Sequence, residues 1–112
     1  MRVVAALILA LLSPACDPPE WQCRQVVKQL VEAGPTSVNA AMDRVVEVGP
    51  CTIVDIEQSF HGGSLATRLR LLEALRRLGS PEGLPILRFY ARWDDEPQVR
   101  EAAKKAAASL QR

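Results

Sequence analysis

Apolar residues recur every three or four positions along most of the chain, which is the spacing of an amphipathic helix. The clearest run begins after Ser64, a residue type that can N-cap a helix, and ends at Gly79. Its leucines share one side of the predicted helix, while its arginines fall mostly on the other sides. These leucines are Leu65, Leu69, Leu72, Leu75 and Leu78.

Glycine and proline divide residues 20–112 into six helical runs. Ser80-Pro81-Glu82 supplies an N-cap, a proline for the first turn and an acid near the positive helix end. Asp94–Pro97 starts the last run in the same way. No segment pairs strand alternation with a hairpin turn, so the pattern predicts an all-α fold.

The first 15 residues have the pattern of an export signal. Arg2 precedes an apolar run from Val3 to Leu12, and small or turn-forming residues follow. The run is shorter than the roughly 20 residues that span a bilayer. A buried N-terminal helix is the alternative interpretation.

The residues around Cys16 resemble a bacterial lipoprotein box, read as Leu12-Ser13-Pro14-Ala15-Cys16. The resemblance implies cleavage before Cys16 and acylation of its sulfur, with residues 16–19 forming the lipidated cysteine and a short proline-rich tether. The box usually carries leucine where this chain has Ser13. Because Ser13 and Ala15 also satisfy an ordinary signal peptidase, plain secretion stays open.

Export and cysteine parity point to a disulfide. If Cys16 is acylated, Cys23 and Cys51 remain as a pair in an oxidising compartment. A bridge between them would close a loop of about 28 residues. Two buried free thiols on neighbouring helices are the alternative.

Composition and charge narrow the function classes. The chain has 112 residues, 48% hydrophobic, and a net charge of +1, which fits one small domain and disfavours a strongly basic nucleic-acid binder. The charge is unevenly distributed. Residues 16–63 hold three cations and seven acids, whereas residues 64–112 hold ten cations and six acids. The processed chain is therefore expected to be a dipole, with a basic free end.

The helical runs repeat with a period of 30 to 32 residues, because Val48-Gly49 aligns with Leu78-Gly79 and Thr67-Arg68 aligns with Val99-Arg100. The stretch from Arg68 to Leu110 resembles HEAT repeats of the short variety named after phycobilisome lyases. The resemblance implies an α-solenoid of about three stacked antiparallel helix pairs over residues 20–112. It also implies a structural pair between Asp94 in the turn and Arg100 in the next helix. Residues 20–48 fit either a degenerate first repeat or, as we prefer, a cap with a polar outer face.

The residue types needed for catalysis are sparse. His61 is the single histidine, and no GxSxG motif accompanies it. His61-Gly62-Gly63-Ser64 is better explained as a turn followed by an N-cap, and Asp94, Asp95 and Glu96 as acids at a helix start. We therefore expect no catalytic residue, no metal site and no cofactor.

A basic surface is the candidate binding site. Cations on successive second helices would fall in register in a solenoid, and Tyr90 is the aromatic that we expect to be exposed, with Phe89 in the core. The candidate partner-binding residues are Arg68, Arg76, Tyr90, Arg100, Lys104 and Lys105. An ordinary solvated face is the competing interpretation. No aromatic platform lies among these cations, so nucleic acid is not expected as the ligand.

Together these features predict a non-catalytic interaction or scaffold module in the bacterial cell envelope, held by a lipid anchor facing the periplasm and serving an unidentified protein partner. Two alternatives remain open. A secreted or periplasmic chaperone or inhibitor would use the same surface without the lipid. A lyase or isomerase accessory, as in the phycobilisome-lyase family, would need a concave pocket.

Overall fold

The computed structural model describes residues 17–111, which form six α-helices and one short 3₁₀ turn. No strand occurs in that range, and the expected all-α fold is confirmed. The expected signal in residues 1–15 and the expected lipidation at Cys16 lie outside the described residues. The elements are α2 (Glu20–Glu32), α3 (Val38–Val48), α4 (Thr52–Phe60), α5 (Leu65–Leu78), η2 (Pro81–Gly83), α6 (Leu84–Trp93) and α7 (Pro97–Leu110).

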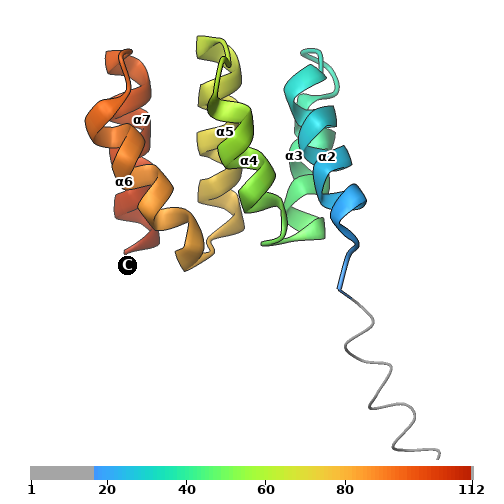
Figure 1. The fold of residues 1–112 in the computed structure, drawn as a ribbon. Coiled ribbons are helices and arrows are strands. Elements are labelled where there is room, and N and C mark those ends of the chain that lie inside the picture. Colours follow the sequence, from blue (N-terminus) through green and yellow to red (C-terminus); the bar gives the residue numbers. More distant parts are fainter. Residues whose placement is uncertain (1–16, 112) are drawn as a thin grey trace, which may run out of the picture.

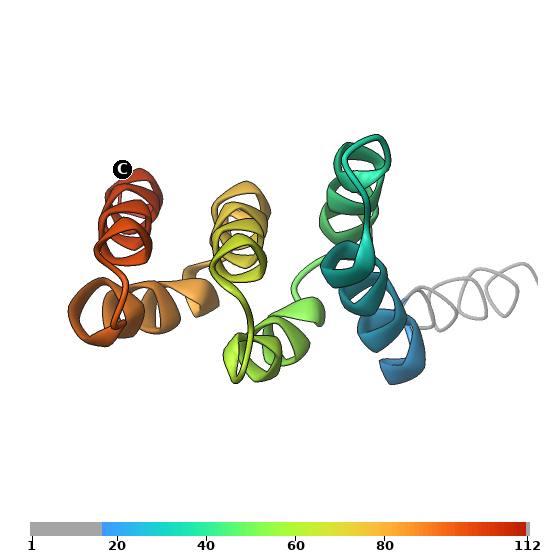
Figure 2. The same ribbon diagram turned by 90° about the horizontal axis from the view of Figure 1, so that it is seen from above.

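The helices lie in two rows. Helices α2 and α3 occupy one end of the molecule, α4 and α5 the middle, and α6 and α7 the other end (Figure 1). Seen from above, α2, α4 and α6 form one row and α3, α5 and α7 the other (Figure 2). Helix α5 packs against α3, α4 and α7, so it is the central element of the array.

The core runs through the array as one cluster of buried side chains contributed by every α-helix. On α5 the buried residues are Leu71, Leu72, Ala74 and Leu75, whereas Leu65, Leu69 and Leu78 are only partly buried. The predicted leucine stripe is therefore correct in part. Its centre is rotated because α5 is enclosed by helices from both neighbouring pairs, which buries a wider face than one stripe.

The predicted helix boundaries follow the expected turn chemistry at several positions. The Ser64 hydroxyl accepts a hydrogen bond from the Thr67 amide at 3.2 Å, as an N-cap should. Gly79 ends α5 with a φ of 64°, a left-handed conformation that glycine adopts without steric cost. Ser37 directly precedes α3, but its hydroxyl bonds to the main chain of Gly34 instead of capping the helix.

The predicted disulfide between Cys23 and Cys51 is present, with a Cα–Cα distance of 5.9 Å. It joins α2 to the residue just before α4, so the loop of chain that it closes contains α3. Cys23 is 2% exposed. The bridge therefore fixes the end of the array at which the described chain begins.

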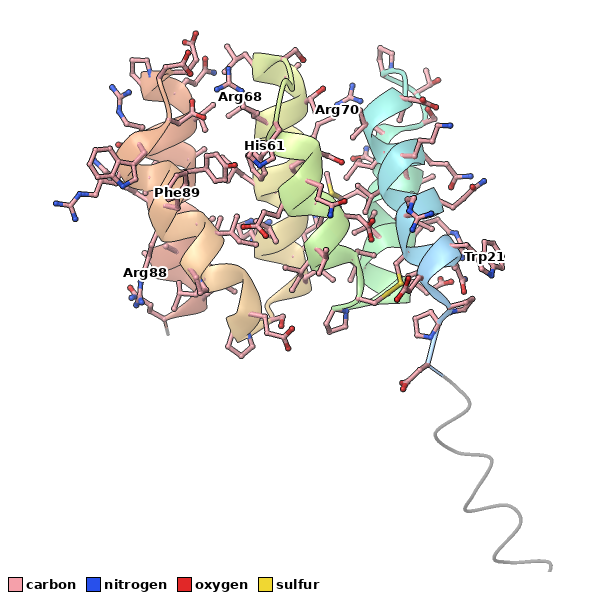
Figure 3. The ribbon with its side chains drawn as sticks, viewed as in Figure 1. Trp21, His61, Arg68, Arg70, Arg88 and Phe89 are labelled. Atoms are coloured by element: carbon pink, nitrogen blue, oxygen red, sulfur yellow. A yellow bond between two sulfur atoms is a disulfide. The ribbon has the colours of Figure 1, made fainter. Side chains whose placement is uncertain are left out.

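Two arginines of α5 reach in opposite directions along the array (Figure 3). The Arg70 guanidinium donates to the main-chain oxygens of Leu30 and Ala33, at 3.2 and 2.7 Å, and so satisfies carbonyls at the end of α2. Arg68 reaches the turn between α6 and α7 instead. The central helix thus ties both outer pairs to itself through polar contacts as well as core packing.

Across residues 17–111, no helix combines the length and the apolar character that crossing a membrane requires.

Candidate interaction surface

Arg68, a predicted member of the basic surface, is a structural residue instead. Only 15% of its side chain is exposed, and its Nη1 donates to both Asp94 carboxylate oxygens, at 2.8 and 2.7 Å. The same nitrogen lies 3.0 Å from Asp95 Oδ1. The bond to Arg68 lowers the pKa of the Asp95 carboxyl. Because its guanidinium is already paired with two carboxylates of the neighbouring turn, Arg68 is a weaker candidate for an external partner than the sequence suggests.

Arg76 is exposed but already paired. Arg76 and Arg77 both bond to Glu73, one turn back on α5, at distances of 2.7 to 2.9 Å. These bonds, with Arg76 the stronger influence, lower the pKa of the Glu73 carboxyl to about 2. The local charge of the cluster is therefore partly neutralised, and Arg76 is a weaker candidate for an external anion than the sequence suggests.

The expected contact between Asp94 and Arg100 exists, but its acceptor differs from the expected one. Arg100 Nη1 donates to the main-chain oxygen of Asp94 at 2.7 Å. The Asp94 carboxylate is occupied by Arg68 and by the Glu96 amide, which lies 3.0 Å from Oδ2. Arg100 therefore caps the end of α6, while the ion pair forms between helix pairs rather than within one.

The aromatic residues of α6 are oriented opposite to the prediction. Tyr90 stacks on Phe60 of α4, with ring centroids 4.2 Å apart, and burial raises the pKa of its hydroxyl, with smaller contributions from Glu57 and Asp94. Phe89, expected in the core, is 55% exposed. Ile86 and Leu87 face the core, and Tyr90 follows them at helical spacing, which turns Phe89 outward.

An exposed stripe of alternating cations and aromatics therefore runs along α6. Its members are Arg88, Phe89, Arg92 and Trp93, at positions that recur on one side of a helix. Trp93 is 66% exposed, and the Arg92 guanidinium carbon lies 5.6 Å from the centroid of its ring. Trp21 is equally exposed but lies at the opposite end of the array (Figure 3).

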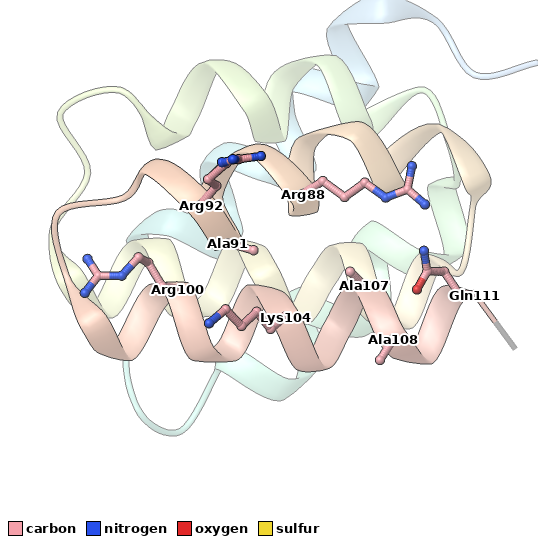
Figure 4. A pocket seen from close by; sticks show the side chains of 8 residues that line it. All are labelled: Arg88, Ala91, Arg92, Arg100, Lys104, Ala107, Ala108 and Gln111. Atoms are coloured by element: carbon pink, nitrogen blue, oxygen red, sulfur yellow. The ribbon is translucent and has the colours of Figure 1, made fainter.

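An open groove of about 710 Å³ lies beside this stripe, between α6 and α7. Arg88 and Arg92 border it on α6, and Arg100 and Lys104 border it on α7 (Figure 4). Alanines form its floor, namely Ala91, Ala107 and Ala108, and Gln111 closes one end. None of the described residues lining it carries a carboxylate, so its formal charge is +4. We call this feature the basic groove.

Comparisons with protein-family models, curated proteins and solved structures find no match.

The predicted residues divide between the basic groove and other places. Arg100 and Lys104 line the groove, and Lys105 is exposed on α7 outside it, next to Glu101 at helical spacing. His61 is exposed where α4 ends, ahead of the turn through Gly62. Within residues 17–111, no group of three His, Cys, Asp or Glu residues is placed to hold a metal ion.

Sequence reasoning missed Arg88 and Arg92, the α6 side of the basic groove. A signal was present in the chain. The two arginines are four residues apart, as are Arg100 and Lys104 on the next helix. Residues four apart lie on one side of a helix, so two such pairs can line one groove if the two sides adjoin. Finding them required knowing which side of α6 faces outward, and the apolar pattern alone did not give it.

Proposed function

We propose that this protein is a non-catalytic interaction module of the bacterial cell envelope, built as a short HEAT-like solenoid of three stacked antiparallel helix pairs. The observation that carries the proposal is the exposed stripe of α6, where Phe89 and Trp93 stand in solvent beside Arg88 and Arg92. Tryptophan, tyrosine and arginine dominate the binding energy of protein interfaces. Exposed apolar side chains that cluster beside polar residues mark interaction sites on protein surfaces.

The register of α5 and α7 supports the solenoid. Both helices have 14 residues, and α7 begins 32 residues after α5. Three of the four buried residues of α5 have a buried counterpart at this offset in α7, namely Ala103, Ala106 and Ala107. Equivalent positions that stay buried along a chain are the pattern of stacked repeats.

The disulfide supports the envelope location. Disulfides persist in oxidising compartments and are rare in the bacterial cytoplasm. The Cys23–Cys51 bridge agrees with the export signal and with the lipid anchor proposed at Cys16. With the chain anchored through its N-terminal end, the exposed stripe of α6 would lie at the far end of the array, where a partner in the periplasm can reach it.

Site-specific photo-crosslinking in cells tests the proposal. We expect a photoreactive phenylalanine analogue at position 93 to give a discrete adduct with one envelope protein, because Trp93 lies in the proposed interface. The matched control is position 54 on α4, because Val54 is 61% exposed and Trp93 is 66% exposed. Adducts of equal yield at both positions, or at position 54 alone, would contradict an interface on α6.

A further inference from the structure

The α7 side of the basic groove is equivalent, by the 32-residue repeat, to the face of α5 that contacts the last helix pair. On α5, Arg68, Leu72 and Leu75 lie on one helix face. Arg68 bonds to Asp94 in the α6–α7 turn, and Leu75 Cδ2 would lie 3.3 Å from a β-carbon placed on Gly83. Both ends of this face therefore contact the following pair, and Leu72, between them, is 2% exposed. The next helix pair therefore packs on this face of α5, which we call the inner seat.

The same face on α7 is the α7 side of the basic groove. At the 32-residue offset, Arg100 corresponds to Arg68, Lys104 to Leu72 and Ala107 to Leu75. No helix of residues 17–111 packs on this face beyond α6. The main difference between the two seats is chemical, since a buried leucine in the first is replaced by an exposed lysine in the second. The equivalent face of α7, the outer seat, is therefore shaped to accept a helical element, and its positive charge favours an acidic one.

We propose that the basic groove binds an acidic helical segment of a partner protein, an inference that rests on the proposed interaction function. Carboxylates of this segment pair with Arg88, Lys104 and Arg100, as Asp94 pairs with Arg68 inside the array. The alanine floor allows the backbone of a docking helix to approach closely, because interaxial distance depends on the side chains at the contact. Opposite charge then specifies the partner and speeds its association.

The lining of the opposite groove favours a partner protein over a second copy of this chain that docks end to end. The opposite end of the array also has a groove, between α2 and α3, and its charged lining residues are Glu32 and Arg44. One acid and one base leave that groove without net charge, so its lining does not complement the basic groove. Position disfavours a lipid headgroup, because the groove lies at the end of the array remote from α2, the first described helix (Figure 1).

Peptide binding to the purified full chain tests the proposal. The probe is a fluorescent alanine-based helix of about 20 residues with glutamates four apart, and a matched peptide has glutamine at the same positions. Fluorescence anisotropy at low salt should show the glutamate peptide binding at least about tenfold more tightly than the glutamine peptide. The double variant Arg88→Glu/Lys104→Glu should weaken binding of the glutamate peptide by at least about tenfold.

The matched control is Arg24→Glu/Lys28→Glu, which makes the same charge change at two exposed positions four apart on α2. We expect it to change the affinity by less than about twofold, because it lies far from the groove. Arg88 and Lys104 are both exposed, so their replacement should leave the helical circular dichroism signal unchanged, and Arg88→Gln/Lys104→Gln should give an intermediate affinity.

Four outcomes would overturn the inference. The two peptides bind equally, or the two charge-reversal variants lose affinity equally. Phosphatidylglycerol vesicles bind through Arg88 and Lys104 while the peptide does not. The chain forms a concentration-dependent dimer that the Arg88→Glu/Lys104→Glu variant abolishes and the peptide does not displace. If the Trp93 crosslink persists in any of these cases, only the groove inference fails. If it is also absent, the proposed function fails with it.

Discussion

Replacing Arg68 with alanine is expected to lower the free energy of unfolding by about 3 kcal/mol. The change removes the cation that faces Asp94, whose side chain is only 4% exposed, and leaves a buried carboxylate without its counter-charge. Losing one partner of a buried ion pair costs about 3 to 5 kcal/mol. We expect the lower value, since Arg68 Nε is itself buried with no hydrogen-bond partner among the described residues. The Glu96 amide also continues to donate to Asp94.

Urea unfolding followed by circular dichroism measures this loss. The control is Arg44→Ala, which breaks an exposed pair with Glu47 three residues along the same helix and should cost less than about 0.5 kcal/mol. An Arg68→Ala loss no larger than the control would mean that the contact between α5 and the α6–α7 turn does not hold the last pair in place.

The acid dependence of stability gives the same variant a second readout. The bond to Arg68 lowers the pKa of the Asp95 carboxyl. Stability from this contact is therefore present above the ordinary pKa of an aspartate and is lost as the pH falls through the lowered value. Arg68→Ala removes the largest cause of the lowered Asp95 pKa, so the stability of the variant should vary less with pH over that acidic range.

Removing the disulfide is also expected to lower the free energy of unfolding by a large amount. In the chain-entropy model, a bridge across a separation of 28 residues stabilises the fold by about 3.5 kcal/mol. The double variant Cys23→Ala/Cys51→Ala should therefore melt well below the parent protein. In this variant the α2 end of the array should unfold first, because the bridge joins α2 to the start of α4.

Thermal melting with and without a reductant measures the effect. Reductant should lower the midpoint of the parent protein toward that of the double variant and leave the variant unchanged, which controls for effects on Cys16. A parent midpoint that does not respond to reductant, measured after thiol labelling has shown that the bridge is open, would contradict a stabilising role.

Local chemistry made much of the fold predictable. Ser64 and Gly79 bound α5 as expected, because an N-cap hydroxyl and a left-handed glycine act within one helical turn. The pairing of Cys23 with Cys51 followed from cysteine parity and from the expectation of an oxidising compartment. These features depend on neighbours in sequence or on simple counting.

The orientation of α6 was not predictable in the same way. Its apolar residues occur on every side of the helix, so periodicity does not choose between Phe89 and Tyr90. Phe60 of α4 stacks on Tyr90 and so turns Tyr90 inward. This contact depends on how the middle and last helix pairs pack together. The prediction of the residue that pairs with the Asp94 carboxylate failed for the same reason. Arg100 is near in sequence, but Arg68, 26 residues away, takes the carboxylate.

The intact mass of the unreduced protein from the membrane fraction is the most direct test of an anchored envelope module. We predict the mass of residues 16–112 with added acyl chains, less the two hydrogens lost in forming the Cys23–Cys51 bond. A bare mass of residues 16–112 in the soluble fraction would contradict the lipid anchor and favour a secreted protein. Residues 1–15 still attached, with both cysteines reduced, would contradict export itself.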